Sequence, residues 1–254
     1  MLNIIPIPAF EDNYIWLLHN NRDAVVVDPG DAAPVIATLQ KLNLTLTAIL
    51  ITHHHSDHIN GVADLLRYQQ APVPIPVYAP QYERFDFEHI KLADGDKIDL
   101  PKIAQNFRVM WLPGHTLGHI AYFNDDHLFC GDTLFGAGCG RLFEGTPAQM
   151  LASLARLKAL NGNTKVFCTH EYTAKNIAFA LTLEPDNADL LARASAVKQL
   201  RSQNLPSLPS TIALELATNP FLRCNQASII KNSQTQNQAE LSVFTAIRTL
   251  RNHY

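Results

Sequence analysis

Short runs of apolar residues, separated by turn residues, dominate the first two thirds of the chain. Strand-like runs lie within residues 24–27, 47–51, 74–80, 107–114, 121–132 and 164–171. Between some of them, apolar residues recur about every 3.6 positions, which predicts amphipathic helices over residues 31–42, 62–70 and 146–160. Thr146 is a candidate N-cap, with Pro147 at the first helical position. Strands interleaved with helices in this way are typical of a layered α/β body.

After His170 the pattern changes to helical spacing. Predicted helices cover residues 173–185, 187–204 and 239–254, with prolines between them. The chain is therefore expected to divide into a mixed α/β domain over residues 1–172 and a small helical domain over residues 173–254.

Composition narrows the class of protein. The 254 residues are enough to bury a sizeable core. No apolar run approaches the ~18 residues of a membrane span. The start of the chain has no basic segment and contains Pro6 and Pro8, which is unlike a signal peptide, so a cytoplasmic protein is expected. A net charge of −3 argues against a nucleic-acid partner.

The four cysteines are scattered without CxxC spacing, and this predicts neither a disulfide framework nor a thiolate zinc site. They are expected to be small buried residues. The eleven histidines are the unusual feature, because several of them cluster.

Histidine and aspartate residues follow the ends of four predicted strands. They are His53, His55, Asp57 and His58 after the strand at 49–51, His115 after 109–112, Asp132 after 128–130, and His170 after 166–168. Each one alone is more simply explained as a structural residue. Strand ends in layered α/β proteins open onto a common crevice, so these seven side chains are expected at one edge of the fold.

The spacing within the first cluster predicts which side chains act together. Alternate side chains of an extended segment face the same way, so His53 and His55 can bind one ion. Asp57 and His58 lie past the bend into the next helix and can reach another, whereas His54 points away. Imidazole and carboxylate ligands without thiolate favour zinc, iron or manganese at an open site. Seven ligands suit two divalent ions that share Asp132, roughly 3.5–4 Å apart.

The segment THHHSDH at residues 52–58, followed by separate His, Asp and His ligands, resembles the signature of the metallo-β-lactamase superfamily. The chain is most similar to the glyoxalase II, or hydroxyacylglutathione hydrolase, family within it. The motifs that carry this resemblance are PAFEDNY (8–14), VDPGD (27–31), PGHTLGH (113–119), GDTLFGAGCGRLFEG (131–145) and THEYT (169–173), together with the helical tail.

The resemblance implies an αββα sandwich with a small C-terminal all-helical domain and a binuclear metal site. One ion would be held by His53, His55 and His115, the other by Asp57, His58 and His170, with Asp132 bridging. His119 would lie just outside the ligands. Asp28 would accept a hydrogen bond from a ligand imidazole, although a turn-forming role before Pro-Gly is an alternative.

The family's reaction is hydrolysis of S-D-lactoylglutathione and related glutathione thioesters to D-lactate and glutathione, the second step of methylglyoxal detoxification. A hydroxide bridging the two ions, oriented by Asp57, would be the nucleophile. The leaving thiolate needs little protonation. The resemblance therefore implies a small-molecule substrate, and the enzyme is expected to be a monomer.

Glutathione is anionic, so its binding residues should be basic. The resemblance places Arg141, Phe143, Tyr172, Arg248 and Arg251 at the substrate. The family often has Lys at the position of Arg141 and Tyr at the position of Phe143, and the missing hydroxyl leaves one glutathione contact open. For the two tail arginines, a solvated helix face is the alternative.

Other activities of the same fold are not separated by the HxHxDH loop alone. They include those of a lactonase, a β-lactamase, a nucleic-acid phosphodiesterase and an iron-dependent persulfide dioxygenase. A metal-binding scaffold that has lost catalysis is the alternative from another class.

Overall fold

The computed structural model describes residues 2–69, 75–236 and 238–254. Gln70 and Pro74, which end a predicted helix and begin a predicted strand, lie outside the described residues. The chain forms two compact units. The N-terminal unit comprises Met1–Trp111, Gly118–Asn124 and Leu128–Gly131, and the C-terminal unit comprises Leu112–Leu117, Asp125–His127 and Asp132–Tyr254.

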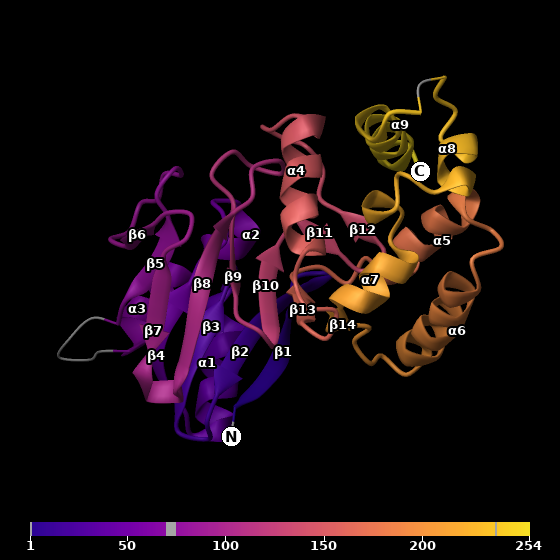
Figure 1. Cartoon of the computed structure of the whole chain (residues 1–254). Helices are drawn as coiled ribbons and strands as arrows, with labels where there is room; N and C mark the ends of the chain where they lie inside the picture. Colours follow the sequence, from indigo (N-terminus) through magenta and orange to yellow (C-terminus); the bar gives the residue numbers. More distant parts are fainter. Residues whose placement is uncertain (1, 70–74, 237) are drawn as a thin grey trace. The chain divides into compact units, whose positions relative to one another are not determined.

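The N-terminal unit is built on a six-stranded sheet with the order β1-β2-β3-β4-β5-β6 (Figure 1). Its strands are β1 (Asn3–Ala9), β2 (Asn13–His19), β3 (Asp23–Val27), β4 (Thr45–Leu50), β5 (Val77–Pro80) and β6 (Ile90–Leu92). β1, β2 and β3 pair antiparallel, whereas β3 to β6 run parallel. Residues 24–27 of β3 and 48–50 of β4 are buried on both faces and form continuous aliphatic runs, as is typical of parallel strands.

A second sheet contributes β7 (Lys97–Leu100), β8 (Gln105–Trp111), β9 (Ile120–Phe123) and β10 (His127–Gly131). These four strands pair antiparallel in chain order, and a short 3-10 turn, η1 (Pro101–Ile103), joins β7 to β8. The two sheets meet at Tyr122, whose buried hydroxyl donates to the carbonyls of Ile51 at 2.8 Å and Tyr78 at 3.0 Å.

α1 (Ala32–Leu42) and α3 (Val62–Gln69) pack on the first sheet through buried aliphatic side chains, and the short α2 (Ser56–Ile59) precedes α3. α1 begins after Asp31, whose side chain accepts from the backbone N–H of Ala33, and its buried Val35 and Leu39 join the core under the sheet. The N-terminal unit therefore has helix, sheet and sheet layers.

The C-terminal unit is mainly helical. It contains α4 (Pro147–Lys158), α5 (Thr173–Leu183), α6 (Ala188–Ser202), α7 (Ile212–Thr218), η2 (Pro220–Leu222), α8 (Ala227–Asn232) and α9 (Glu240–Asn252). Its strands are the short hairpin β11 (Leu134–Phe135) with β12 (Gly138–Cys139), and β13 (Lys165–Cys168) paired with β14 (Ser210–Thr211).

The helices predicted over residues 31–42 and 146–160 are confirmed, and Thr146 caps α4 with Gln149 in a reciprocal capping box. The three predicted tail helices are confirmed as α5, α6 and α9. α7 and α8 were not predicted, because each is seven residues or shorter and gives the 3.6-residue period too few turns to appear.

Candidate metal centre

The N-terminal unit holds four of the candidate ligands directly after β4. His53 and His55 lie in the segment between β4 and α2, with His55 in extended backbone, and the short helix α2 then carries Asp57 and His58. His53 Nε2 lies 3.0 Å from His55 Nδ1, and the His58 ring centroid lies 4.0 Å from that of His53. His53 and His58 are fully buried. The structure thus brings this cluster together inside one unit.

Asp28, which directly follows β3, accepts hydrogen bonds from the segment that carries the cluster. Its Oδ1 accepts from the Thr52 backbone N–H at 2.8 Å, and its Oδ2 accepts from the Thr52 hydroxyl at 2.7 Å and from His58 Nδ1 at 3.0 Å. Asp28 has a φ of 52°, a left-handed conformation that Asp and Asn tolerate best after Gly. Gly30 is required close by, since a Cβ there would lie 1.8 Å from the Asp57 carbonyl oxygen.

Other side chains complete the surroundings of this cluster. Asn13, at the start of β2, is buried and donates from Nδ2 to Asp57 Oδ2 at 2.9 Å. The His119 ring stacks on His53 at 4.7 Å. His54 turns to Glu83, with Nδ1 3.2 Å from Oε2. Sequence reasoning missed Asn13, because an Asn after a hairpin turn is usually read as a turn residue.

The C-terminal unit holds the other three candidate ligands. Asp132 Oδ2 lies 3.4 Å from His115 Nε2 and 3.3 Å from His170 Nε2, and all three residues are buried. His115 Nδ1 donates to the Arg141 carbonyl at 2.9 Å. The His170 ring stacks on Tyr172 at 4.7 Å with an interplanar angle of 3°.

The arrangement of donors fits cations in both units. Because His115 donates through Nδ1, its neutral ring presents a lone pair at Nε2, which faces the Asp132 carboxylate. His58 likewise donates through Nδ1 to Asp28, and its Nε2 lies 3.5 Å from Asp57 Oδ2. Two acceptors at this distance repel each other unless a proton or a cation lies between them. The outer hydrogen bonds therefore orient both rings as metal ligands.

The predicted substrate residues in the C-terminal unit differ in exposure. Arg141 and Phe143 are exposed, and the Phe143 ring lies 5.2 Å from that of His115. Arg248 is buried, with Nη1 2.7 Å from the Cys139 carbonyl and its guanidinium 5.1 Å from the Phe221 ring. Arg251 is half-buried and donates from Nε and Nη2 to Asn176 Oδ1 at 3.2 and 3.1 Å.

The arginines form a region of positive potential. Burial lowers the pKa of Arg251, and the nearby charges of Arg248 and Arg141 lower it further. The fold brings the three arginines together, because Arg248 and Arg251 lie three residues apart on α9 and Arg248 Nη1 lies 3.5 Å from the carbonyl of Gly140, the residue before Arg141. Such a cluster favours an anion as its partner.

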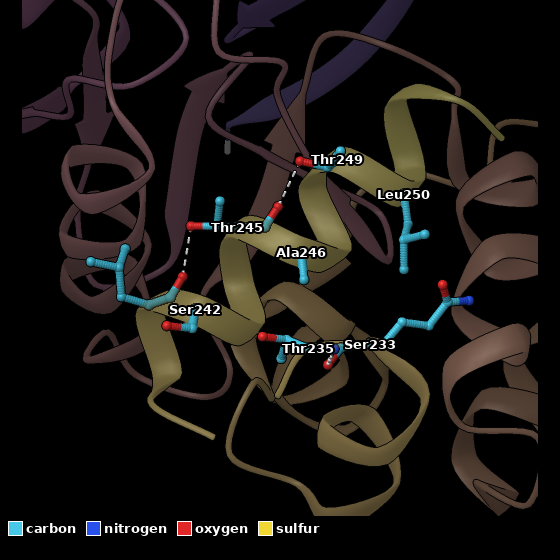
Figure 2. A pocket seen from close by; sticks show the side chains of 9 residues that line it. Ser233, Thr235, Ser242, Thr245, Ala246, Thr249 and Leu250 are labelled. Carbon is cyan, nitrogen blue, oxygen red and sulfur yellow. Dashed lines mark hydrogen bonds between the residues drawn. The ribbon is translucent and has the colours of Figure 1, made fainter. Parts of the chain in front are cut away.

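A cavity of about 630 Å³ lies elsewhere in the same unit, beside α9 (Figure 2). Among the described residues, only uncharged ones line it, and two of its hydroxyls are used by the helix itself. Thr245 donates to the Leu241 carbonyl at 2.7 Å, and Thr249 donates to the Thr245 carbonyl at 2.9 Å. The described residues that line this cavity therefore offer no charged partner to an anionic ligand.

Among the described residues, no helix is long and apolar enough to cross a bilayer. All four cysteines are buried, as expected for small apolar residues.

Comparison with known proteins extends these observations. Residues 9–170 match the metallo-β-lactamase superfamily, and residues 171–254 match the hydroxyacylglutathione hydrolase C-terminus. A hydroxyacylglutathione hydrolase of Methylobacillus flagellatus is 56% identical over 254 residues, and one of Vibrio parahaemolyticus is 50% identical over 257 residues, each alignment covering 100% of both chains.

Solved structures agree on the fold. The BLEG-1 B3 metallo-β-lactamase has a TM-score of 0.64 at 25% identity, covering 87% of this chain and 99% of its own. ETHE1 from Myxococcus xanthus also has a TM-score of 0.64, at 23% identity, covering 99% of this chain and 98% of its own.

The layered sheets and the His/Asp clusters at their strand ends define a metal-dependent hydrolase of the metallo-β-lactamase class. Within that superfamily, the chain belongs to the hydroxyacylglutathione hydrolase family. The predicted fold class and family are confirmed.

Proposed function

We propose that the protein hydrolyses S-D-lactoylglutathione and related glutathione thioesters to the hydroxy acid and glutathione, the second step of methylglyoxal detoxification. The observation that carries this proposal is that, in each unit, the Nε2 lone pair of a histidine faces an aspartate carboxylate. One of the units also holds the arginine cluster. The full-length hydroxyacylglutathione hydrolase relatives support the same reaction.

We further propose that the seven candidate ligands form one binuclear centre. His53, His55 and His115 would hold one divalent ion, Asp57, His58 and His170 the other, with Asp132 shared between them. Imidazole and carboxylate ligands without thiolate favour zinc, with iron and manganese as alternatives. When bound, two such ions would make a hydroxide available at neutral pH.

The side chains around the reacting group have separate roles in this proposal. Asp57, held by Asn13, orients the attacking oxygen toward the thioester carbonyl carbon. Asp28 and the Arg141 carbonyl keep the ligand rings in the tautomer that presents Nε2. His119, stacked on His53, restricts that ring. Addition of water to the carbonyl carbon breaks the C–S bond and gives a carboxylate, a thiol and one proton.

Substrate recognition is assigned to the C-terminal unit. Arg141 and Arg251 would bind the carboxylates of glutathione, and Arg248 would add positive potential from its buried position. Tyr172 offers a hydroxyl beside His170. Phe143, which lacks the hydroxyl common in the family, would make an apolar contact instead.

The matched ranges of the two families support a division into a catalytic domain at residues 1–172 and a substrate-binding domain at residues 173–254. Because the substrate derives from the cytosolic glutathione pool, we propose a cytoplasmic enzyme. It would act as a monomer, which sedimentation of the purified protein tests.

Thioester hydrolysis by the purified protein is the decisive assay. S-D-lactoylglutathione, a lactone and a β-lactam should be offered in parallel, with metal content measured on the same sample. Turnover confined to the thioester, with about two metal ions per chain, is expected. Two bound metals without turnover of any substrate would favour a non-catalytic scaffold. Iron with oxygen consumption on glutathione persulfide would favour a dioxygenase.

A further inference from the structure

A short hairpin loop (residues 133–140) separates Asp132 from Arg141 in the C-terminal unit. Its two strands, β11 and β12, have two residues each, and Ala137 between them has a φ of 53°. A two-stranded ribbon this short is not stable by itself. Its conformation must therefore be imposed by side chains from elsewhere in the unit.

Two side chains bind the turn of the hairpin loop: Glu215, which lies on α7, and Asn219, the residue that follows α7. Glu215 Oε2 accepts from the Ala137 backbone N–H at 2.8 Å. Asn219 Nδ2 donates to the carbonyls of Phe135 at 3.2 Å and Gly138 at 2.9 Å, and to Glu215 Oε2 at 3.1 Å. Both side chains are fully buried. Together they satisfy three backbone groups of a loop that has almost no ladder of its own.

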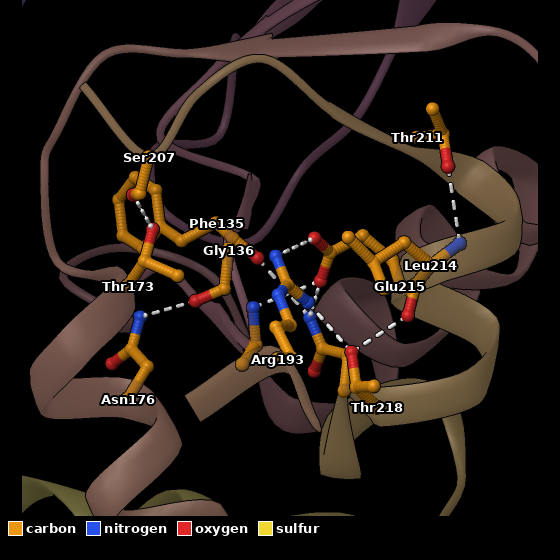
Figure 3. Close-up of polar contacts among 12 residues, drawn as sticks. Phe135, Gly136, Thr173, Asn176, Arg193, Ser207, Thr211, Leu214, Glu215 and Thr218 are labelled. Carbon is orange, nitrogen blue, oxygen red and sulfur yellow. Dashed lines mark hydrogen bonds and ion pairs between the residues drawn. The ribbon is translucent and has the colours of Figure 1, made fainter. Parts of the chain in front are cut away.

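Asn176 and Arg248 bind the same loop from α5 and α9. Asn176 Nδ2 donates to the Gly136 carbonyl at 3.0 Å, a contact seen in Figure 3. Arg248 Nη1 donates to the Cys139 carbonyl at 2.7 Å. The loop is thus held by polar side chains from three helices, α5, α7 and α9, and by Asn219 at the end of α7.

Glu215 is itself fixed by an ion pair with Arg193 of α6 (Figure 3). Arg193 Nη2 lies 2.6 Å from Glu215 Oε1, and its Nη1 donates to the Thr218 hydroxyl at 2.6 Å. Both charged side chains are buried. Apolar residues of similar volume often replace a buried ion pair without loss of stability, so stability alone does not explain this one. The ion pair occupies Oε1 of Glu215 and leaves Oε2 directed toward the hairpin loop.

Both ends of the hairpin loop lead to proposed metal ligands. At one end, Gly140 closes onto the segment of Asp132: its N–H donates to the Thr133 carbonyl at 3.3 Å, and a Cβ there would lie 1.9 Å from the Asp132 carbonyl oxygen. Just beyond the loop, the Arg141 carbonyl accepts from His115 Nδ1 at 2.9 Å. A shift of the loop would move Asp132 and release His115 together.

We propose that Glu215 is a positioning residue for the metal centre. Together with Arg193 and Asn219, it fixes the conformation of the hairpin loop. The loop in turn fixes the position of Asp132 and the orientation of the His115 ring. This inference rests on the proposed function only in that Asp132 and His115 bind metal. It does not depend on which substrate is hydrolysed.

Glu215→Gln tests the proposal on the full-length protein. The glutamine amide group must face either Arg193 or the two donors from Ala137 and Asn219, so a donor meets a donor on one side. Affinity for Co²⁺, measured by chelator competition, is expected to fall about 10- to 100-fold. The visible spectrum of the Co²⁺-loaded protein should change as well.

Glu184→Gln is the matched control. Glu184 is buried in the same unit and pairs with Arg223 through two contacts, at 2.8 and 2.9 Å, and none of its hydrogen bonds reaches the hairpin loop. This substitution also neutralises a buried carboxylate paired with arginine. It should leave the Co²⁺ affinity and spectrum unchanged even where it lowers the melting temperature.

Wild-type Co²⁺ affinity in Glu215→Gln, or an equal loss in Glu184→Gln, would overturn the proposal. If Glu215→Gln does not fold, the double variant Arg193→Met with Glu215→Leu removes both charges and the acceptor of Ala137 together. The double variant should fold and bind Co²⁺ weakly; failure to fold would show a role in folding itself and also overturn the proposal. Normal metal affinity with no thioester turnover in the wild type would refute the proposed function alone.

Discussion

The Asp28 carboxylate lies 3.0 Å from Nδ1 of His58 and at the same time accepts the backbone N–H and the hydroxyl of Thr52. One side chain therefore fixes both the ring of a proposed ligand and the backbone that leads into the histidine cluster. Three donors converge on it, so only an acceptor with two free oxygens satisfies them all.

Asp28→Asn should weaken metal binding about 10- to 100-fold. Asparagine keeps the size of the side chain and tolerates the φ of 52°, but its amide group turns a donor toward either Thr52 or His58. The His58 ring then loses the partner that fixes its tautomer. Chelator competition with zinc measures the effect.

Asp31→Asn is the control for this substitution. Asp31 belongs to the same turn and caps α1 through one oxygen, a task that asparagine performs equally well. Unchanged metal affinity in Asp31→Asn beside a loss in Asp28→Asn would assign the effect to the His58 contact. Equal losses in the two variants would assign it to the turn instead.

His54 should be dispensable for metal binding although it lies between two proposed ligands. Its Nδ1 is directed to Glu83, at 3.2 Å, rather than to the cluster. His54→Asn is expected to retain about two metal ions per chain, whereas His55→Asn should lose at least one. Elemental analysis of the two purified variants decides this, and metal loss in His54→Asn would contradict the assignment.

The histidine cluster was predictable because its chemistry is local. In extended backbone, the two-residue period alone separates His53 and His55 from His54. Helix caps such as Thr146 were predictable for the same reason, since the capping box is complete within four residues. In the same way, the strand over 24–27 was visible because a run of buried aliphatic residues ends in a strong turn signal.

The residues that support the cluster were not predictable, because their partners are distant in the chain. Asn13 meets Asp57 across 44 positions, and Glu215 meets Ala137 across 78. No periodicity marks such a pair, and Glu215 in isolation looks like an ordinary helix-surface glutamate. Burial of its charge, known only from the fold, is what distinguishes it.

Arg251→Gln should raise KM for the thioester with little change in kcat. The Arg251 guanidinium lies in the same region of positive potential as Arg141 and Arg248. A substrate carboxylate bound there takes no part in the reaction, so the contact is equally strong in the ground state and in the transition state. A charged hydrogen bond of about 1.5–3 kcal/mol corresponds to a KM increase of roughly 10- to 150-fold. Steady-state kinetics on S-D-lactoylglutathione measure it.

Lys198→Gln makes the same change in net charge at an exposed position of α6 and should leave KM unchanged. An unaltered KM in Arg251→Gln would remove this arginine from the substrate site. Deleting residues 246–254 is a poorer test, because it also removes the buried side chains of Ile247 and Arg248.

The stability of the protein should fall as the pH rises above about 9, partly because of Cys224. Burial raises the pKa of this thiol from its ordinary 9.0 to about 12 in the folded protein. Between these two values the folded chain keeps a proton that the unfolded chain has lost, so alkaline pH favours unfolding. The contribution of one such thiol is up to about 1.4 kcal/mol per pH unit.

Cys224→Ala isolates this contribution. Urea unfolding of the wild type and the variant at about pH 8 and about pH 10 gives the slope of the unfolding free energy with pH. Alanine leaves a small cavity and lowers stability at both pH values, but it removes the proton difference, so the slope should become shallower. Burial also raises the pKa of Cys139, which remains in the variant and keeps part of the slope. Equal slopes in the two proteins would mean that the Cys224 thiol titrates in the folded state as it does in the unfolded chain.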